Sequence, residues 1–316
     1  MSNSNNSGRQ SATAFAPASV GNVAVGFDVL GLSVQAIGDR VTARRTSERG
    51  VRIAAITGTV VDLPLEADRN TAGRAVMSIV EEQKLDFGIE LTIEKGIPLG
   101  SGLGGSAASA VAAVVAANAL LPQSLSQLSL LKHAMHGEAV ASGSVHVDNI
   151  APSLFGGLVL TVGVDNPNVK QIPMPPGVHC VLVHPHMVLA TKEARKILKP
   201  DVSLSDVIWQ TANLAGFLAG CFTNDLRLIG ESLNDVIIEP QRRVLIPGFD
   251  AVKHAAMSGG ALGCSISGAG PTVFAWVPTN QSTQVRDGMV AAFKAAGLES
   301  DAWISTLEAH GARVID

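Results

Sequence analysis

The chain has 316 residues, of which 47% are hydrophobic and 16% are charged, so it can bury the cores of about two domains and is not globally disordered. A formal net charge of −4 without a basic run argues against a nucleic-acid partner. No apolar stretch reaches the length of about eighteen residues that a membrane span needs, and the three cysteines are too far apart for a disulfide framework or a zinc site.

The N-terminal region divides into a tail and a glycine-punctuated stretch. Residues 1–12 are polar and lack the apolar core of a secretory signal, which predicts a disordered tail and a cytoplasmic location, or an organelle stroma if a targeting segment was removed. Residues 14–31 place Asn22 and Asp28 among glycine and apolar residues. Because an unpaired buried carboxylate is costly, Asp28 should meet a donor or bind a cation. The alternative is a turn residue that caps a helix running on from Val29.

Alternating strands and an amphipathic helix follow. Residues 39–56 predict strands broken near residue 48, and residues 70–84 predict a helix for which Asn70 is either only an N-cap or also a ligand contact. Residues 87–94 alternate with period two, as a half-buried strand does. Residues 107–121 have the composition of a buried helix that ends before Pro122.

Between that strand and helix lies the glycine-rich loop, residues 96–109, which reads GIPLGSGLGGSAAS. Its backbone N–H groups and the helix N-terminus favour an anion, and we expect phosphate. It is not a Walker A loop, because the next lysine lies beyond Leu131. Gly100 begins a match to GxGxxG, but the acidic residue needed about twenty positions later is missing, so NAD is set aside. The alternative is a turn with only a packing role.

Downstream of the loop, polar residues gather again. Residues 125–141 predict a helix that carries Glu138, and His146, Asp148 and Asn149 follow within a few small residues before a core strand at 155–162. Four such groups close together predict a second ligand-facing patch. A satisfied structural network is the alternative.

Four prolines between residues 165 and 177 predict the domain junction. A buried strand at 178–185 and a helix with Thr191 as N-cap come next. Residues 204–233 predict two helices, and residues 281–297 and 302–307 a last helix and strand.

Two features of this second half suggest ligand contacts. Arg242 and its neighbour Arg243 are either solvated or carboxylate clamps. Residues 261–276 predict two strands joined by a glycine-rich turn, whose N–H groups at residues 267–270 are expected to be free for a ligand.

Three stretches occur in a fixed order: APASVGNVAVGFDVLG at 16–31, PLGSGLGGSAAS at 98–109 and GCSISGAGPT at 263–272. Together they resemble the GHMP small-molecule kinases. GFDVLG, SVHVDNIAP, TKEAR and IEPQR are similar to the homoserine kinase family within it. The resemblance covers residues 14 to 314. It implies an α+β fold with a GHMP kinase N-terminal ATP-binding domain over 13–170, containing a left-handed βαβ unit, and a ferredoxin-like C-terminal domain over 171–316.

The resemblance also implies an activity: phosphorylation of the L-homoserine hydroxyl by ATP with Mg²⁺, in threonine biosynthesis. The alternatives are another GHMP kinase, such as one for mevalonate, and a catalytically silent nucleotide-binding regulator.

The resemblance assigns Ser106 and Glu138 to the metal. It assigns the same two residues and Asn149 to catalysis. The implied ATP contacts are Asn70, Lys95, Pro98, Leu99, Gly100, Ser101, Gly102, Leu103, Gly104, Gly105, Ser106 and Ala107. The implied substrate contacts are Asn22, Asp28, His146, Asp148, Asn149, Thr191, Arg195, Arg242 and Gly268.

The assigned charges suit a zwitterion, since Asp28 can meet an ammonium and Arg195 and Arg242 a carboxylate. Two departures from the family pattern stand out. Gly105 replaces a serine, which removes one hydroxyl from the phosphate loop and should weaken nucleotide contacts modestly. The position where mevalonate kinase has a catalytic aspartate is matched here by Asn149, so we expect transfer by positioning and charge neutralisation, without a strong base. A homodimer is possible in this family.

Overall fold

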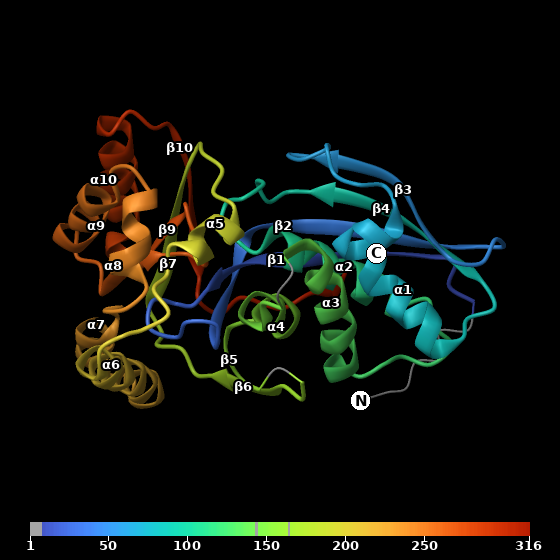
Figure 1. The fold of residues 1–316 in the computed structure, drawn as a ribbon, viewed down its shortest axis with the longest axis horizontal. Coiled ribbons are helices and arrows are strands. Elements are labelled where there is room, and N and C mark those ends of the chain that lie inside the picture. The colour runs from blue at the N-terminus through green and yellow to red at the C-terminus, as the bar shows by residue number, and fades with distance from the viewer. Residues whose placement is uncertain (1–7, 143–144, 164) are drawn as a thin grey trace.

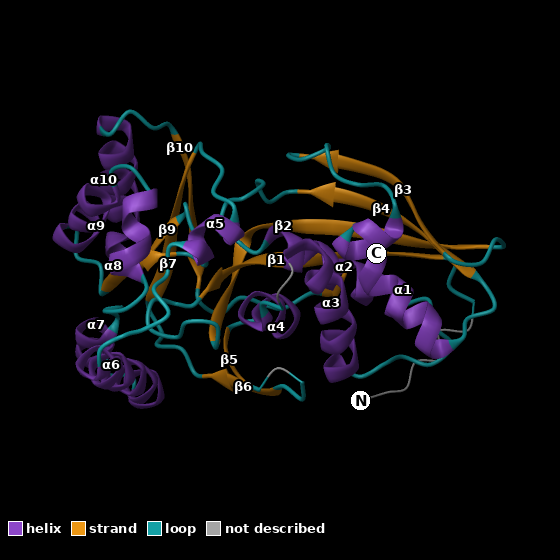
Figure 2. Cartoon of the chain, in the orientation of Figure 1, coloured by secondary structure: helices purple, strands orange, loops and turns teal. Residues whose placement is uncertain are grey.

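The protein, described by a computed structural model over residues 8–142, 145–163 and 165–316, contains two β-sheets and the helices that cover them (Figures 1 and 2). The larger sheet has the strand order β11-β1-β2-β4-β3, with β5 paired to β2 and β6 paired to β5. Its strands are β1 (Ser11–Gly21), β2 (Leu30–Thr46), β3 (Val51–Gly58), β4 (Gly88–Lys95), β5 (Leu158–Val162), β6 (Asn168–Ile172) and β11 (Arg313–Val314).

Four helices pack together on one side of the larger sheet, as Figure 2 shows. Helix α2 lies directly on β1 and β2, and nearly all of its side chains are buried because they are alanine, valine and serine, which allow close approach. The parallel pairing of β3 with β4 through α1 gives a βαβ unit, whose expected left hand stays a prediction. These helices are α1 (Thr71–Gln83), α2 (Gly105–Asn118), α3 (Gln127–Ser142) and α4 (Val147–Phe155).

The smaller sheet is antiparallel, with the order β10-β7-β9-β8. It is buried on both faces: Leu182 of β7 joins the core shared with the larger sheet, whereas its neighbour Val183 joins a second core under α9 and α10. The strands are β7 (Val178–Pro185), β8 (Gly263–Ile266), β9 (Val273–Pro278) and β10 (Ser300–Thr306). The helices are α5 (Thr191–Lys196), α6 (Leu204–Thr223), α7 (Leu226–Ser232), α8 (Glu239–Arg242), α9 (Phe249–Ser258) and α10 (Ser282–Ala295), with 3₁₀ turns at Ala67–Arg69, Arg243–Leu245 and Thr279–Gln281.

The α+β class and most predicted elements are confirmed. The helix expected from Val29 is wrong, because β2 begins at Leu30. Helix α4 was not predicted, because residues 146–149 were interpreted only as a polar patch. The core strand expected from residue 155 begins only at Leu158. No helix of the described residues combines the length and apolar character needed to cross a bilayer.

Strand pairing shows where the chain passes from one sheet to the other. Strand β6, inside the proline-rich stretch, still pairs with β5, and β7 starts the smaller sheet at Val178. The boundary expected at 170/171 therefore falls inside β6. After β10 the chain returns to the larger sheet, where β11 pairs with β1. Of the tail expected over 1–12, residues 1–7 lie outside the described residues, and Ser11 already belongs to β1.

Candidate active site

The glycine-rich loop connects β4 to α2 and lies between the two sheets. Gly102 and Gly104 have φ of 78° and 67°, and each makes a close approach: an added Cβ would lie 2.5 Å from the Ser267 carbonyl oxygen and 2.2 Å from Ser19 Oγ, respectively. Only glycine adopts this backbone without strain in so little space. The chain therefore turns sharply just before the N-terminus of α2.

Four carbonyl groups of the loop accept hydrogen bonds from residues outside the loop. Three of these donors belong to the second half of the chain. Gly100 O accepts from Leu189 N at 3.1 Å, Ser101 O from Thr272 N at 3.1 Å and Leu103 O from Ser19 N at 3.1 Å. The Ser267 hydroxyl donates to Gly102 O at 2.8 Å. With these carbonyls turned toward the protein, the backbone N–H groups of the loop and of the first turn of α2 are the donors suited to an anion.

Gly105 and Ser106 open helix α2, and Ala107 is buried behind them. A Cβ on Gly105 would lie 3.2 Å from Cγ2 of Ile97, so glycine suits the tight packing at this position. The effect of this departure on nucleotide contacts stays a prediction.

Ser106 and Glu138 are brought together from α2 and α3. Ser106 Oγ donates to Glu138 Oε1 at 3.0 Å. Burial raises the pKa of Glu138 to about 7, although the hydrogen bond from Ser106 and the charge of Lys95 act in the opposite direction. A hydroxyl and a carboxylate side by side at the loop are oxygen ligands of the kind that Mg²⁺ prefers.

Lys95 and Asn70 lie near the loop, but both side chains are engaged by the protein. The Lys95 ammonium is buried beneath the loop in an ion pair with Asp39. Asn70 caps α1, since its Oδ1 accepts from Ala72 N at 3.0 Å while its Nδ2 donates to Pro64 O at 2.9 Å. Their contacts with a nucleotide therefore stay predictions, and the N-cap reading of Asn70 is confirmed.

The second polar patch belongs to the start of α4. Ligand atoms of Asp28, His146 and Asp148 all lie within 4.8 Å of one another. Burial, followed by the nearby charge of Asp28, raises the pKa of Asp148 to about 7, and its Oδ1 has no hydrogen-bond partner among the described residues. Burial lowers the pKa of His146. Asn149 accepts from Ser19 Oγ at 3.0 Å, which places it against Gly104 of the loop.

Asp28 is half-exposed and pairs with Arg195 of α5 in a bidentate ion pair at 2.8 and 3.0 Å. Its backbone is left-handed, with φ of 60°, and Asn22 Oδ1 accepts from its N–H at 3.0 Å. Asp28 therefore meets a donor, which is one of the two outcomes expected from its sequence context. Thr191 is exposed in the first turn of α5 but is not the N-cap, which is Ala190.

Arg242 is 3% exposed and approaches the same place from α8. Its Nη1 donates to Gly268 O at 3.0 Å, and Asn22 Nδ2 donates to the same oxygen at 2.9 Å, so Gly268 joins the two halves of the chain. Burial, followed by repulsion from Arg195, lowers the pKa of Arg242 to about 10. The Phe27 ring lies 5.1 Å from each of the two guanidinium groups.

Three of the four N–H groups in the turn at residues 267–270, which the sequence suggested would be free, are engaged by the protein. Ser267 N donates to Thr272 O at 2.9 Å, Gly268 N to Gly21 O at 3.1 Å and Gly270 N to Ser267 O at 2.8 Å. The expectation is wrong for these three groups, because the turn closes on itself and on β1. The contribution of this turn to the site is the Gly268 carbonyl, which accepts from Arg242 and Asn22.

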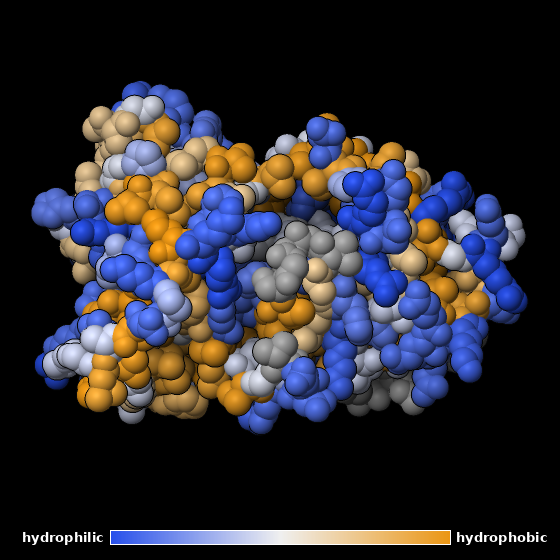
Figure 3. Space-filling view, in the orientation of Figure 1, coloured by the Kyte–Doolittle hydropathy of each residue, from blue (hydrophilic) through white to orange (hydrophobic). Residues whose placement is uncertain are grey.

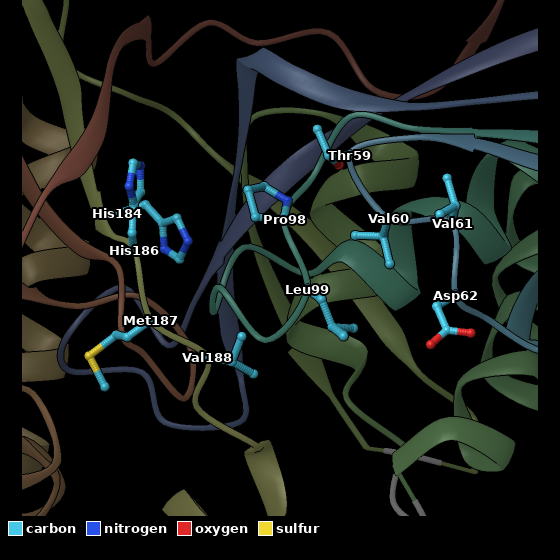
Figure 4. Close-up of a pocket in the computed structure, with 10 residues that line it drawn as sticks. All are labelled: Thr59, Val60, Val61, Asp62, Pro98, Leu99, His184, His186, Met187 and Val188. Atoms are coloured by element: carbon cyan, nitrogen blue, oxygen red, sulfur yellow. The ribbon is translucent and has the colours of Figure 1, made fainter.

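A cavity of about 490 Å³ opens at the start of the loop (Figure 4). Three segments line it: the turn after β3, the first loop residues Pro98 and Leu99, and the end of β7 with the residues that follow. Its lining is largely apolar, with Val60, Leu99 and Val188 among the contributors. Such a cavity beside an anion site suits a ligand that carries both a ring and phosphates.

Sequence reasoning missed Asp39, Phe27 and the cavity wall from Thr59 to Asp62. Asp39 stands in a strand pattern and Phe27 in a glycine-rich stretch, so neither spacing nor composition marks them. The apolar pair Val60 and Val61 between a strand and a helix is the one local signal for the cavity wall.

A glycine-rich loop leading into a buried helix, held by a second α+β domain that supplies arginines, is the arrangement of the GHMP class of small-molecule kinases. The sequence matches GHMP kinases N terminal domain over residues 70–157 and GHMP kinases C terminal over residues 217–295. Homoserine kinase from Xylella fastidiosa strain M12 is 51% identical over 96% of this chain and 94% of its own. Homoserine kinase from Xanthomonas campestris pv. campestris strain B100 is 52% identical over 98% and 95%.

Among solved structures, that of homoserine kinase from Cytophaga hutchinsonii superposes with a TM-score of 0.94 at 45% identity, covering 98% of both chains. The galactokinase of Lactococcus lactis, at 15% identity, shares the fold with a TM-score of 0.72 over 97% of this chain and 96% of its own. The chain therefore belongs to the homoserine kinase family of the GHMP kinases. It is an ATP-dependent kinase whose acceptor is a small molecule.

Proposed function

We propose that this protein transfers the γ-phosphoryl group of ATP to the side-chain hydroxyl of L-homoserine, giving O-phospho-L-homoserine and ADP for threonine biosynthesis in the cytoplasm. The observation that carries this proposal is the meeting of Asp28, Arg195 and Arg242 beside the glycine-rich loop. An amino acid needs one anionic and one cationic partner, and two arginines beside one aspartate supply both. The curated relatives at about half identity are named homoserine kinase.

Substrate binding would exchange partners within this cluster. The Asp28 carboxylate turns to the ammonium group of homoserine, and Arg195, released from Asp28, joins Arg242 on the carboxylate. The exposed Asp28 and Arg195 side chains can move, whereas Arg242 is held by carbonyl oxygens of Ala194 and Gly268. Asn22, Thr191 and Gly268 would complete the walls of the substrate pocket.

ATP would lie along the loop. The cavity at Pro98 and Leu99 would hold the nucleoside, and the N–H groups of the loop and of α2 would donate hydrogen bonds to the phosphates. Ser106 and Glu138 fit Mg²⁺ by their chemistry, because they place two hard oxygen donors together in a buried setting. Mg²⁺ bound there would offset the negative charge of the phosphates. Residues 98–107 would then surround the triphosphate.

Asn149, His146 and Asp148 would orient the acceptor hydroxyl. Asn149 lies against Gly104, so its amide is close to where the transferred group would sit. An amide is not a base, and the transition state of phosphoryl transfer demands little proton abstraction. The rate would come from holding the hydroxyl in line and from neutralising charge.

The test is an ADP-release assay with homoserine, mevalonate, galactose and shikimate as acceptors. We expect turnover with homoserine to exceed that with each of the other compounds by a wide margin. Preference for any other acceptor would overturn the proposal. ATP binding without turnover on any of the four would instead indicate a silent nucleotide-binding protein.

We further propose that the protein is a homodimer joined through α6. In this helix of 20 residues only Phe217, Gly220 and Cys221 are buried. Large side chains stand in solvent, with Leu204 76% exposed, Trp209 62% and Phe222 65%. In Figure 3 hydrophobic side chains gather over α6.

Two features favour a second copy as the partner. These side chains together expose on the order of 500 Å² of apolar surface along the helix. Asp206 is the only charged residue of the helix, so a partner of opposite charge is not needed. A helix of this kind can pack against its own copy across a two-fold axis.

We expect Trp209→Glu to give a monomer in sedimentation experiments, whereas Val162→Glu, on β5, should leave the dimer intact. A monomeric wild-type protein at micromolar concentration would contradict the proposal.

A further inference from the structure

A buried polar cluster lies directly beneath the glycine-rich loop. It consists of Asp39 from β2, Lys95 at the end of β4 and Ser109 in the second turn of α2. Their exposed fractions are 0%, 6% and 4%. The proposed chemistry uses neither Asp39 nor Ser109, and a charge this deep is costly unless it is fully paired.

The Asp39 carboxylate holds the first residues of the loop. Its Oδ1 accepts from Gly96 N at 3.0 Å and from Ile97 N at 3.2 Å. Its Oδ2 accepts from Ser109 Oγ at 2.6 Å and also from Lys95 Nζ. With four donors the carboxylate is satisfied, and the place where the chain leaves β4 is fixed.

The Lys95 ammonium holds the other end of the loop. Besides Asp39, its Nζ donates to Gly105 O at 2.8 Å and to Ser109 Oγ at 2.8 Å, so its three protons all have acceptors. Gly105 and Ser109 belong to the start of α2, so the ammonium also fixes where the helix begins.

The backbone of Lys95 extends the connection to the cavity. Its carbonyl oxygen accepts from Thr59 N at 2.8 Å and from Thr59 Oγ1 at 3.1 Å, and Thr59 lines the cavity. The side chains of this ion pair therefore hold the start of the loop and the N-terminus of α2, and the backbone of Lys95 holds the cavity wall.

We propose that Asp39, Lys95 and Ser109 are positioning residues that hold the glycine-rich loop and the cavity wall in the geometry that ATP requires. This rests on the proposed role of the loop in binding ATP. The pair is not needed to join its two strands, because β2 and β4 already pair along their backbones from Arg40 with Glu94 to Thr46 with Gly88. Nor is a buried ion pair by itself a source of net stability relative to apolar side chains. The hydrogen bonds of the ion pair are instead made to the two ends of the loop.

The experiment removes the charges together, since removing one would leave the other unpaired. The test variant combines Asp39→Asn with Lys95→Met. The control combines Arg44→Met and Arg52→Met with Glu90→Gln, which removes the two ion pairs of Glu90, with Arg44 on β2 and with Arg52 on β3, away from the loop. We expect both variants to fold, but only the test variant to show a KM for ATP raised at least 10-fold, with a smaller change in the KM for homoserine. We also expect its amides at residues 98–104 to exchange faster in the protein without ligand.

Ser109→Ala provides a second variant that preserves the fold, because alanine suits an alanine-rich helix. It removes the hydroxyl that bridges Asp39 and Lys95, and we expect it to raise the KM for ATP at least 3-fold. The positioning role would be overturned if the KM for ATP stayed within 3-fold of wild type and amide exchange were unchanged. This result would have to hold in Ser109→Ala and, where it folds, in the test variant. Amide exchange is read without substrate, so this result stays separate from a failure of the wild-type enzyme to phosphorylate homoserine.

Discussion

At Glu138, stability and proposed function oppose each other. Its pKa is about 7 in the folded protein against 4.5 in an unfolded chain, because burial disfavours the carboxylate. Between these values the folded state binds more protons, so the free energy of unfolding falls as pH rises from about 4.5 to 7. The loss persists at higher pH and is recovered only when a cation binds.

We therefore expect Glu138→Gln to be more stable than wild type at pH 8 without ligands, by up to roughly 3 kcal/mol, and to lose this advantage near pH 4.5. Its activity should fall at least about 100-fold, because a ligand for Mg²⁺ is gone. Thermal unfolding at several pH values and steady-state kinetics measure the two effects. Glu308→Gln, at an exposed carboxylate, serves as the control. A variant less stable than wild type at pH 8 would contradict the argument.

Phe27 offers a second prediction at the scale of one side chain. Its ring lies 5.1 Å from each of Arg195 and Arg242, and the face of the ring offsets part of their repulsion. We expect Phe27→Leu to raise the KM for homoserine roughly 3- to 10-fold, with little change in the KM for ATP.

The chain provides a matched control for this change. Phe15 also lies near two arginines, at 5.7 Å from Arg40 and 5.3 Å from Arg313, but neither of these arginines belongs to the proposed substrate site. Phe15→Leu should leave both KM values near those of wild type. Equal behaviour of the two variants would show that the Phe27 ring has no special role.

At the scale of elements, sequence patterns predicted the loop and α2 but not α4. Apolar periodicity and the glycines of the loop act locally, so they are visible in sequence. Helix α4 depends on burial of Ile150 and Leu154 against the rest of the core, which overrides the helix-breaking tendency of Pro152. Asp28 and Arg195 are 167 positions apart, and only the resemblance to a family, not the pattern, put them in one site.

The geometry of the loop makes its own prediction. Gly102 has φ of 78° and no room for a Cβ beside the Ser267 carbonyl, whereas Gly177 has φ of 75° and open space. Gly102→Ala should therefore shift the loop and raise the KM for ATP at least about 10-fold, since misplacement on the order of 1 Å is costly. Gly177→Ala carries the same backbone strain without the collision. If both variants bind ATP equally, the contact between loop and turn is not what shapes the site.

On the scale of the whole molecule, one hydrophobic core crosses the junction between the two sheets. Phe217 of α6 packs edge to face on Trp276 of β9, with ring centroids 5.2 Å apart, and both belong to the cluster that includes β1 and α2. The site depends on this continuity, because the loop comes from one half and Arg195 and Arg242 come from the other. We infer that the two halves unfold together.

Phe217→Ala should then lower the stability of the entire chain by about 3 to 5 kcal/mol, as large core truncations do, and should do so in one transition. Calorimetry, together with amide exchange in β1 and in β9, measures whether both sheets respond. Phe293→Ala, in the separate core under α9 and α10, is the comparison, and its first effect is expected at the smaller sheet. Two resolved transitions in Phe217→Ala, with β1 unaffected, would mean that the halves are independent and that the site is assembled by docking, not by a shared core.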